Sequence, residues 1–212
     1  MPEKPRLQVA IDTLTIEEAI ALAEHLRDTI DLIEAGTPFI KRYGIGVVTR
    51  LREASGLPVV ADLKIVDGGP FEAGLAVDAG AALVTVLATA ADATVSGVVE
   101  VAHAGGLEVA SDLLGVHDLP QRIGQLERMG VDYLGVHAGT DARLAGGTDL
   151  MSEIGLVTAT SDMRLVVAGG LNANSIPGVL GFHPAIVVVG SAITAADDPV
   201  AAAREIRTVI DG

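Results

Sequence analysis

The sequence predicts an α/β protein built as a single (β/α)8 TIM-type barrel, and three observations lead to this expectation. The chain has 212 residues, enough for one domain with a full hydrophobic core. Apolar residues make up 50% of it and aromatic residues only 2%, so the core must be aliphatic, as suits parallel strands covered by helices. Short apolar runs alternate with longer amphipathic stretches throughout. We expect one barrel domain over residues 1–212, with a doubly wound open sheet as the main alternative.

Eight apolar runs are the candidate strands, and helical stretches separate them. In chain order the runs are residues 7–11, 30–33, 58–61, 83–87, 107–110, 133–136, 165–168 and 185–189. The first helix opens at Thr15, with Glu18 three residues on in a capping-box pattern. Two prolines and two glycines mark the starts and ends of other helices: Pro120, Pro177, Gly56 and Gly130. The pattern predicts about eight strand–helix units.

The composition excludes several classes of function. A net charge of −14 and the shortage of aromatic side chains argue against nucleic-acid binding. The absence of cysteine excludes disulfides and thiolate chemistry. No stretch resembles a signal sequence or a membrane-spanning helix. We therefore expect a soluble, cytoplasmic protein.

Polar residues and glycines follow the candidate strands in a consistent way. The residues in chain order are Asp12, Glu34, Asp62 with Lys64, Asp112, His137, Gly169-Gly170 and Gly190-Ser191. In a barrel the carboxyl ends of all strands meet on one rim, which is where active sites of this fold lie. Each residue also has an ordinary interpretation, such as a turn or helix cap for the aspartates. Their convergence on one rim favours a site.

Two of these residues suggest a metal. Glu34 and Asp62 come from neighbouring strands, so their carboxylates can share a hard divalent cation such as Mg²⁺. The alternative is a hydrogen-bonded polar cluster. Because side chains alternate along a strand, Lys64 shares a face with Asp62, where it either forms an ion pair or stabilises a developing oxyanion.

The remaining strand ends suggest acid–base chemistry and anion binding. His137 is the one histidine placed at a strand end, and an imidazole suits general acid–base work near neutral pH. The segments Gly169-Gly170 and Gly190-Ser191 offer backbone N–H groups, and barrels often bind a phosphate there. Turn formation alone is the competing interpretation of these glycines.

With these residues laid out, the chain resembles the 3-hexulose-6-phosphate synthases of the orotidine-5′-phosphate decarboxylase superfamily. The likeness covers nearly the whole chain and includes an Asp-x-Lys-x-x-Asp signature at Asp62, Lys64 and Asp67. The other matching segments are Leu7-Gln8-Val9-Ala10-Ile11-Asp12, Glu34-Ala35-Gly36-Thr37-Pro38, Val84-Thr85-Val86-Leu87 with Asp92-Ala93-Thr94, Val136-His137-Ala138-Gly139-Thr140-Asp141 and Val189-Gly190-Ser191-Ala192-Ile193-Thr194.

The resemblance implies an aldol condensation of formaldehyde with D-ribulose 5-phosphate through a metal-stabilised enediolate. Glu34 and Asp62 would hold Mg²⁺, Lys64 would hydrogen-bond the intermediate, and His137 or a carboxylate would transfer the proton. The residues that we expect to contact the substrate are Asp12, Thr37 and Asp112, with the phosphate at Gly169, Gly170, Gly190 and Ser191. In this superfamily the residue matching Asp67 reaches into the partner's site, which implies a homodimer.

Relatives with the same signature provide the rival interpretations. Orotidine-phosphate decarboxylases are metal-free and carry a lysine where this chain has Glu34. The 3-keto-L-gulonate-6-phosphate decarboxylases keep the metal but have an arginine after the strand-eight glycine, where this chain has Ser191, and another shortly after the strand-six histidine. Here Arg143 lies further on. A lysine aldolase using a Lys64 Schiff base and a non-catalytic sugar-phosphate sensor are the alternatives from other classes.

Overall fold

Eight parallel strands close into a barrel in sequence order, and the last strand pairs back to the first. The computed structural model describes residues 4–146 and 149–212. The strands are β1 (Arg6–Ile11), β2 (Leu32–Ala35), β3 (Val59–Ile65), β4 (Leu83–Leu87), β5 (Glu108–Asp112), β6 (Tyr133–His137), β7 (Arg164–Ala168) and β8 (Ile186–Val189). The predicted (β/α)8 barrel is confirmed, and the open-sheet alternative is excluded.

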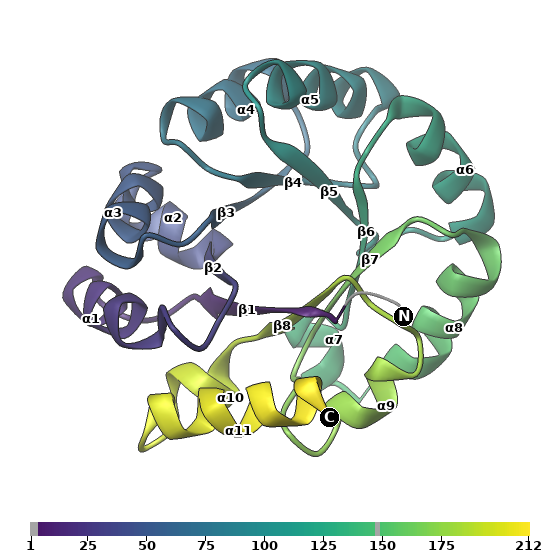
Figure 1. Cartoon of the computed structure of the whole chain (residues 1–212). Helices are drawn as coiled ribbons and strands as arrows, with labels where there is room; N and C mark the ends of the chain where they lie inside the picture. Colours follow the sequence, from purple (N-terminus) through teal and green to yellow (C-terminus); the bar gives the residue numbers. More distant parts are fainter. Residues whose placement is uncertain (1–3, 147–148) are drawn as a thin grey trace.

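Helices lie around the barrel, most of them in an outer ring (Figure 1). They are α1 (Ile16–Leu26), α2 (Thr37–Tyr43), α3 (Gly46–Ser55), α4 (Gly69–Asp78), α5 (Asp92–Ala104), α6 (Leu119–Met129), α7 (Thr140–Leu144), α8 (Leu150–Thr160), α9 (Ile176–Leu180), α10 (Ser191–Thr194) and α11 (Pro199–Asp211). The capping box of Thr15 and Glu18 forms at the start of α1. The other predicted boundary residues also lie at helix ends, with Gly56 and Gly130 capping α3 and α6 and Pro120 and Pro177 in the first turns of α6 and α9.

Strands β2, β3, β5 and β6 extend further toward their carboxyl ends than the predicted apolar runs, whereas the other four end as predicted. Strand β2 is shifted by two residues from the predicted 30–33, because the Ile30 amide still bonds the end of α1, at the Leu26 carbonyl. Strands β3, β5 and β6 continue through Asp62, Asp112 and His137. Their polar side chains point into the mouth of the barrel, where they are paired, so their polarity does not end the strands.

Alternate residues of each strand face two different cores. A small cluster fills the inside of the barrel and includes Ala10, Val60, Ala110 and Tyr133. A much larger cluster, almost entirely aliphatic, lies between the strands and the helices. Asp12, Asp62 and Asp112 each follow a residue of this inner cluster by two positions. The pleat of the strands therefore directs these side chains into the mouth above the inner core.

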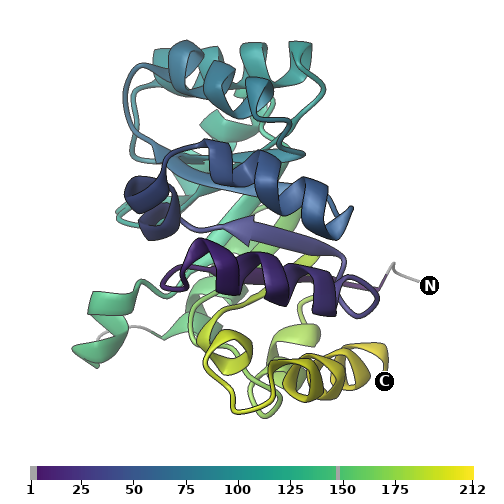
Figure 2. The same ribbon diagram turned by 90° about the vertical axis from the view of Figure 1, so that its left-hand side faces the viewer.

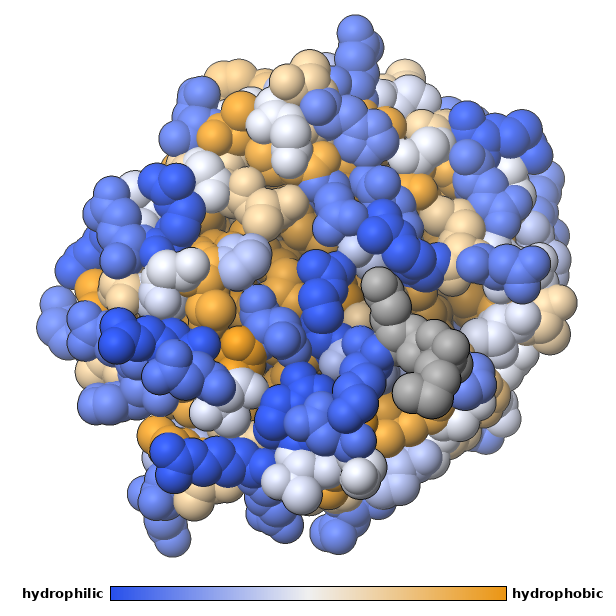
Figure 3. Space-filling view, in the orientation of Figure 1, coloured by the Kyte–Doolittle hydropathy of each residue, from blue (hydrophilic) through white to orange (hydrophobic). Residues whose placement is uncertain are grey.

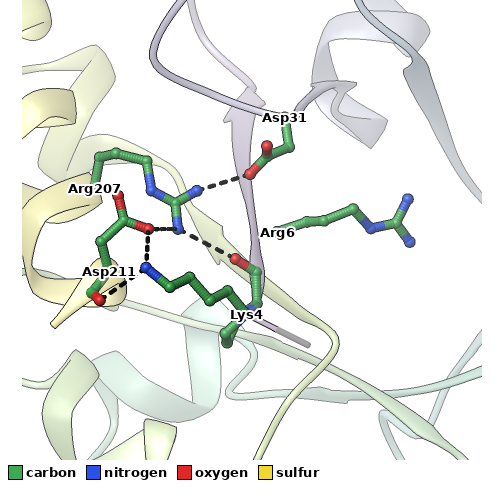
Figure 4. A pocket seen from close by; sticks show the side chains of 6 residues that line it. Lys4, Arg6, Asp31, Arg207 and Asp211 are labelled. Atoms are coloured by element: carbon green, nitrogen blue, oxygen red, sulfur yellow. Dashed lines mark hydrogen bonds and ion pairs between the residues drawn. The ribbon is translucent and has the colours of Figure 1, made fainter. Parts of the chain in front are cut away.

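Ion pairs lie at the opposite end of the barrel. Both chain termini lie there, as Figures 1 and 2 together show. In Figure 3, hydrophilic side chains gather over the middle of this end. Arg207 of α11 pairs with Asp31 at 2.8 Å and Asp211 at 3.1 Å, and Lys4 donates to the Asp211 carbonyl at 3.0 Å (Figure 4). These residues line a cavity of about 340 Å³, and a second cavity of about 420 Å³ lies beside Tyr133.

Among the described residues, no helix combines the length and the apolar character needed to cross a membrane.

Candidate active site

The polar residues predicted at the strand ends meet at the carboxyl-terminal mouth of the barrel. Asp62 is their centre and is only 5% exposed. Its Oδ1 accepts from the Thr85 hydroxyl at 2.8 Å and from Lys64 Nζ at 3.1 Å. Its Oδ2 lies 2.8 Å from the Thr37 hydroxyl, which also contacts the Asp62 carbonyl at 2.7 Å. The carboxylate is therefore fixed in orientation by donors from three elements.

Lys64 bridges two buried carboxylates. Its ammonium donates to Asp62 and, at 2.8 Å, to Oδ2 of Asp112. Burial disfavours the charged ammonium, but Asp62 and Asp112 outweigh it and raise the pKa of Lys64 above its ordinary value. Burial likewise raises the pKa of Asp112, yet His137 and Lys64 overcome this and lower it to about 2. Near neutral pH the pair of Lys64 and Asp112 is ionic, so the lysine is held as a cation at a fixed point.

His137 lies at the end of β6 beside the same aspartate. Its Nδ1 is 3.5 Å from Asp112 Oδ2, and its side chain is 24% exposed. No hydrogen-bond partner for this buried nitrogen is found within residues 4–146 and 149–212. The ring thus lies at the mouth beside a carboxylate, so His137 is placed to exchange a proton with a molecule bound there.

Glu34 and Asp12 complete a crowded group of carboxylates with Asp62. Glu34 accepts a hydrogen bond from the amide of Gln8, a residue that is 3% exposed. Burial raises the pKa of Glu34 to about 8, and the charge of Asp62 adds to the rise against the effects of Gln8 and Lys64. Burial and Asp62 also raise the pKa of Asp12. Burial and the neighbouring carboxylates thus disfavour the ionised forms of Glu34 and Asp12.

The crowding of these carboxylates bears on the predicted metal. No group of three or more histidines and carboxylates able to hold an ion occurs in the part of the chain that the structure describes. Mg²⁺, however, is usually held by one or two carboxylates together with water and substrate oxygens. The donor chemistry of Glu34 and Asp62 fits that pattern, and a cation there would offset the burial and the charge of Asp62 that together raise the pKa of Glu34.

Close backbone approach at the mouth explains two glycines. A Cβ at Gly36 would lie 2.0 Å from Oδ1 of Asp12, so only glycine leaves room for that carboxylate. Gly169, which follows β7 with φ at 110°, packs against Ala138; a Cβ there would lie 2.6 Å from the Ala138 Cβ. Gly190 and Ser191 follow the neighbouring strand β8, so both glycine-containing segments border the same side of the mouth.

A cation whose role the sequence did not indicate, that of Arg143, lies over Gly170. The Cδ and Nε atoms of Arg143 would be 3.1 and 3.2 Å from a Cβ at Gly170. Arg143 comes from α7, which extends beyond the carboxyl ends of the strands in Figure 2. Its position in the sequence, several residues past His137, gave no sign of this contact.

Asp67 stands apart from the other predicted residues. It lies beyond the end of β3 and is exposed. The exposed side chains of Val66, at 58%, and Phe71, at 74%, are its neighbours in the sequence. Within one chain, none of the hydrogen bonds that join Asp62, Lys64 and Asp112 includes it.

The partners that hold the site residues were also missed from the sequence. Gln8 and Thr85, which donate to Glu34 and Asp62, lie in the middle of apolar strands. Glu153 of α8 holds no site residue, but burial and the charge of Asp112 raise its pKa. The period of two in the strands was the available signal, because it puts Gln8 and Thr85 on the same inward face as Ala10 and Leu83.

A closed parallel barrel with carboxylates, a lysine and a histidine gathered at its carboxyl-terminal mouth defines a (β/α)8-barrel enzyme. The model of the Orotidine 5′-phosphate decarboxylase / HUMPS family matches residues 5–206, and the chain belongs to this family. The family expected from the sequence is thereby confirmed.

Individual relatives span nearly the full chain. The protein is 40% identical over 207 residues to 3-hexulose-6-phosphate synthase 3 of Staphylococcus saprophyticus, covering 97% of this chain and 99% of the relative. A crystal structure of 3-hexulose-6-phosphate synthase from Salmonella typhimurium superposes with a TM-score of 0.93 at 39% identity, covering 97% and 98% of the two chains. The 3-keto-L-gulonate-6-phosphate decarboxylase of Vibrio cholerae superposes with a TM-score of 0.87 at 28% identity, covering 99% and 98%.

Proposed function

We propose that the protein is a 3-hexulose-6-phosphate synthase, an aldehyde-lyase that condenses formaldehyde with D-ribulose 5-phosphate to D-arabino-hex-3-ulose 6-phosphate. The observation that carries the proposal is the Lys64 ammonium held between Asp62 and Asp112, 3.1 and 2.8 Å away, in a family whose full-length relatives bear this name. A fixed cation of this kind stabilises negative charge that appears on a bound sugar.

The phosphate of the substrate would bind on the glycine side of the mouth. Backbone N–H groups of Gly169, Gly170, Gly190 and Ser191 would hold its oxygens. Arg143, lying against Gly170, would add a positive charge. Such a charge matters because the other wall of the mouth carries acidic side chains, whose ionised forms would repel a dianion.

Glu34 and Asp62 would hold Mg²⁺ at the opposite side of the sugar. When bound, the ion supplies positive charge that stabilises the substrate's oxygens as a proton leaves the neighbouring carbon. Lys64 donates a hydrogen bond to the oxygen that gains charge, while Asp12, Thr37 and Asp112 border the sugar hydroxyls. Because Asp62 and Asp112 keep Lys64 protonated, it acts as a hydrogen-bond donor and not as a base.

The proton would move through His137 or a nearby carboxylate. The base takes a proton from C1 of ribulose 5-phosphate, and the electrons of that C–H bond pass into the enediolate. C1 then forms a bond to the carbon of formaldehyde, whose oxygen takes up a proton. Asp112, with its pKa near 2, stays ionised beside His137 and stabilises the imidazolium between these two transfers.

A homodimer would complete the site. Asp67, together with Val66 and Phe71, forms an exposed and partly apolar surface next to the end of β3. We propose that this surface packs on a second copy and that Asp67 enters the partner's mouth. Formaldehyde and the sugar phosphate are then the only other partners required, and the cytoplasm is the proposed location.

The proposal is tested by offering the protein ribulose 5-phosphate with and without formaldehyde, and 3-keto-L-gulonate 6-phosphate, each with Mg²⁺ and with a chelator. We expect formaldehyde-dependent turnover that the chelator abolishes. Faster decarboxylation of the gulonate would identify the decarboxylase instead, although Ser191 and the lower identity to that group disfavour it.

Two further results would reject the mechanism. Trapping of substrate on Lys64 by borohydride, with activity retained in chelator, would indicate a Schiff-base aldolase. Tight binding of ribulose 5-phosphate without turnover and without exchange of its C1 proton in D₂O would indicate a sugar-phosphate sensor.

A further inference from the structure

Strand β3 is irregular at the centre of the site. Its pairing with β4 matches Ala61 to Val84 and Ile65 to Val86, so three residues of β3 stand opposite the single residue Thr85. Within this bulge, Lys64 has a φ of 48°, in the left-handed region that lysine rarely adopts. A conformation of this kind costs roughly 1–3 kcal/mol and persists only where surrounding contacts enforce it.

The hydroxyl of Thr85 makes such a contact. The backbone N–H of Lys64, turned away from the regular ladder, donates to Thr85 Oγ1 at 2.9 Å. Since a backbone amide can only donate, the hydroxyl accepts there, and its own proton goes to Oδ1 of Asp62 at 2.8 Å. Lys64 Nζ reaches the same Oδ1 at 3.1 Å. The three residues form a closed ring of hydrogen bonds.

This ring joins the backbone of Lys64 to the position of its side chain. We propose that Thr85 is a positioning residue: it holds the left-handed turn at Lys64 and the rotamer of Asp62, and so aims the ammonium at the point between Asp62 and Asp112. Val84 and Val86, on either side of Thr85, face the outer core and cannot form these hydrogen bonds. The positioning of Lys64 by Thr85 does not depend on the proposed function, whereas its consequence for catalysis rests on that function.

Three variants separate positioning from general packing. Thr85→Val keeps the shape but removes the hydroxyl, and Thr85→Ser restores it. Thr49→Val is the matched control, because the Thr49 hydroxyl is also half-buried and bonded at 2.9 Å, but to the Ala79 carbonyl far from the mouth. The sequence contains three lysines, Lys4, Lys41 and Lys64, so ¹⁵N-lysine labelling gives a short, assignable set of amide signals.

In Thr85→Val we expect amide hydrogen exchange at Lys64 to accelerate about tenfold, because one hydrogen bond to a charged network is lost. The exchange rates of Lys4 and Lys41 should stay as in the parent protein. We expect kcat for ribulose 5-phosphate and formaldehyde to fall roughly tenfold or more, with KM changing little, because the phosphate contacts remain. Thr85→Ser should recover both values, and Thr49→Val should alter neither.

Unchanged exchange at Lys64 in Thr85→Val would overturn the proposal, and so would equal acceleration at all three lysines with no recovery in Thr85→Ser. If the parent protein has no synthase activity, the proposed function fails. The exchange measurement, made without metal or substrate, would still decide the geometric claim.

Discussion

Replacing Glu34 with glutamine should stabilise the metal-free protein at neutral pH. The pKa of Glu34 is raised from 4.5 to about 8 by burial and by Asp62, so the folded state keeps a proton that the unfolded chain releases. The stability linked to this group is complete below pH 4.5 and is lost as the pH rises toward 8. Glutamine resembles the protonated carboxyl at every pH and avoids the loss.

The size of the effect follows from the shift. A pH of 7 lies 2.5 units above the ordinary glutamate pKa of 4.5 and below the raised pKa of about 8. At about 1.4 kcal/mol per unit, Glu34→Gln should raise the free energy of unfolding by about 3 kcal/mol. At pH 4.5 the difference should be close to zero.

Urea unfolding in chelator between pH 4.5 and 8 measures this difference, with Glu24→Gln on the exposed face of α1 as the control. Excess Mg²⁺ should then stabilise the parent protein and leave Glu34→Gln unchanged, because an ion that binds only the folded state shifts the equilibrium toward it. A loss of stability in Glu34→Gln that is equal at pH 4.5 and pH 8 would refute the reasoning.

Three other predictions concern separate parts of the site. Asp112→Asn should lower the free energy of unfolding by about 2 kcal/mol at pH 7, because the pKa of Asp112 in the folded protein lies below its ordinary value of 3.8. In urea titrations this difference should vanish as the pH falls from 4 toward 2, and an equal loss at pH 2 would contradict the pairing. Arg143→Gln should weaken the binding of inorganic phosphate roughly tenfold, because a charge-assisted hydrogen bond is lost. Binding is followed by ³¹P NMR, with the exposed Arg50→Gln as a control that should bind as the parent does. Equal affinities of the parent and Arg143→Gln would remove Arg143 from the site. Phe71→Lys should convert a dimer into monomers in sedimentation equilibrium and reduce activity with them, because a charge would enter an apolar contact; a dimer that persists would place the interface elsewhere.

The sequence was informative about the barrel because strand and helix periodicity are local properties. All eight apolar runs became strands, and the rule that strand ends converge brought Asp62, Lys64, Asp112 and His137 to one mouth. The exact ends of the strands were not predictable from hydrophobicity. The charged residue Asp62 can continue strand β3 because Thr85 of β4 and Thr37 of α2 form hydrogen bonds with its carboxylate.

Features that depend on contacts between distant segments escaped prediction for the same reason. The left-handed backbone of Lys64 is held by Thr85, 21 residues away in the sequence. The contact of Arg143 with Gly170 depends on the path of α7 over the mouth. Neither leaves a mark in local composition, whereas the glycine required at position 36 becomes understandable once Asp12 is seen against it.

The most direct test of the account is to locate the cation. Crystals grown with Mn²⁺ in place of Mg²⁺ and soaked in ribulose 5-phosphate would reveal it by anomalous diffraction. The account predicts one ion bound at roughly 2.0–2.3 Å by an oxygen of Glu34 and an oxygen of Asp62, with the sugar completing its coordination. Anomalous density elsewhere, with these two carboxylates bound to no ion in a protein whose activity requires one, would contradict it.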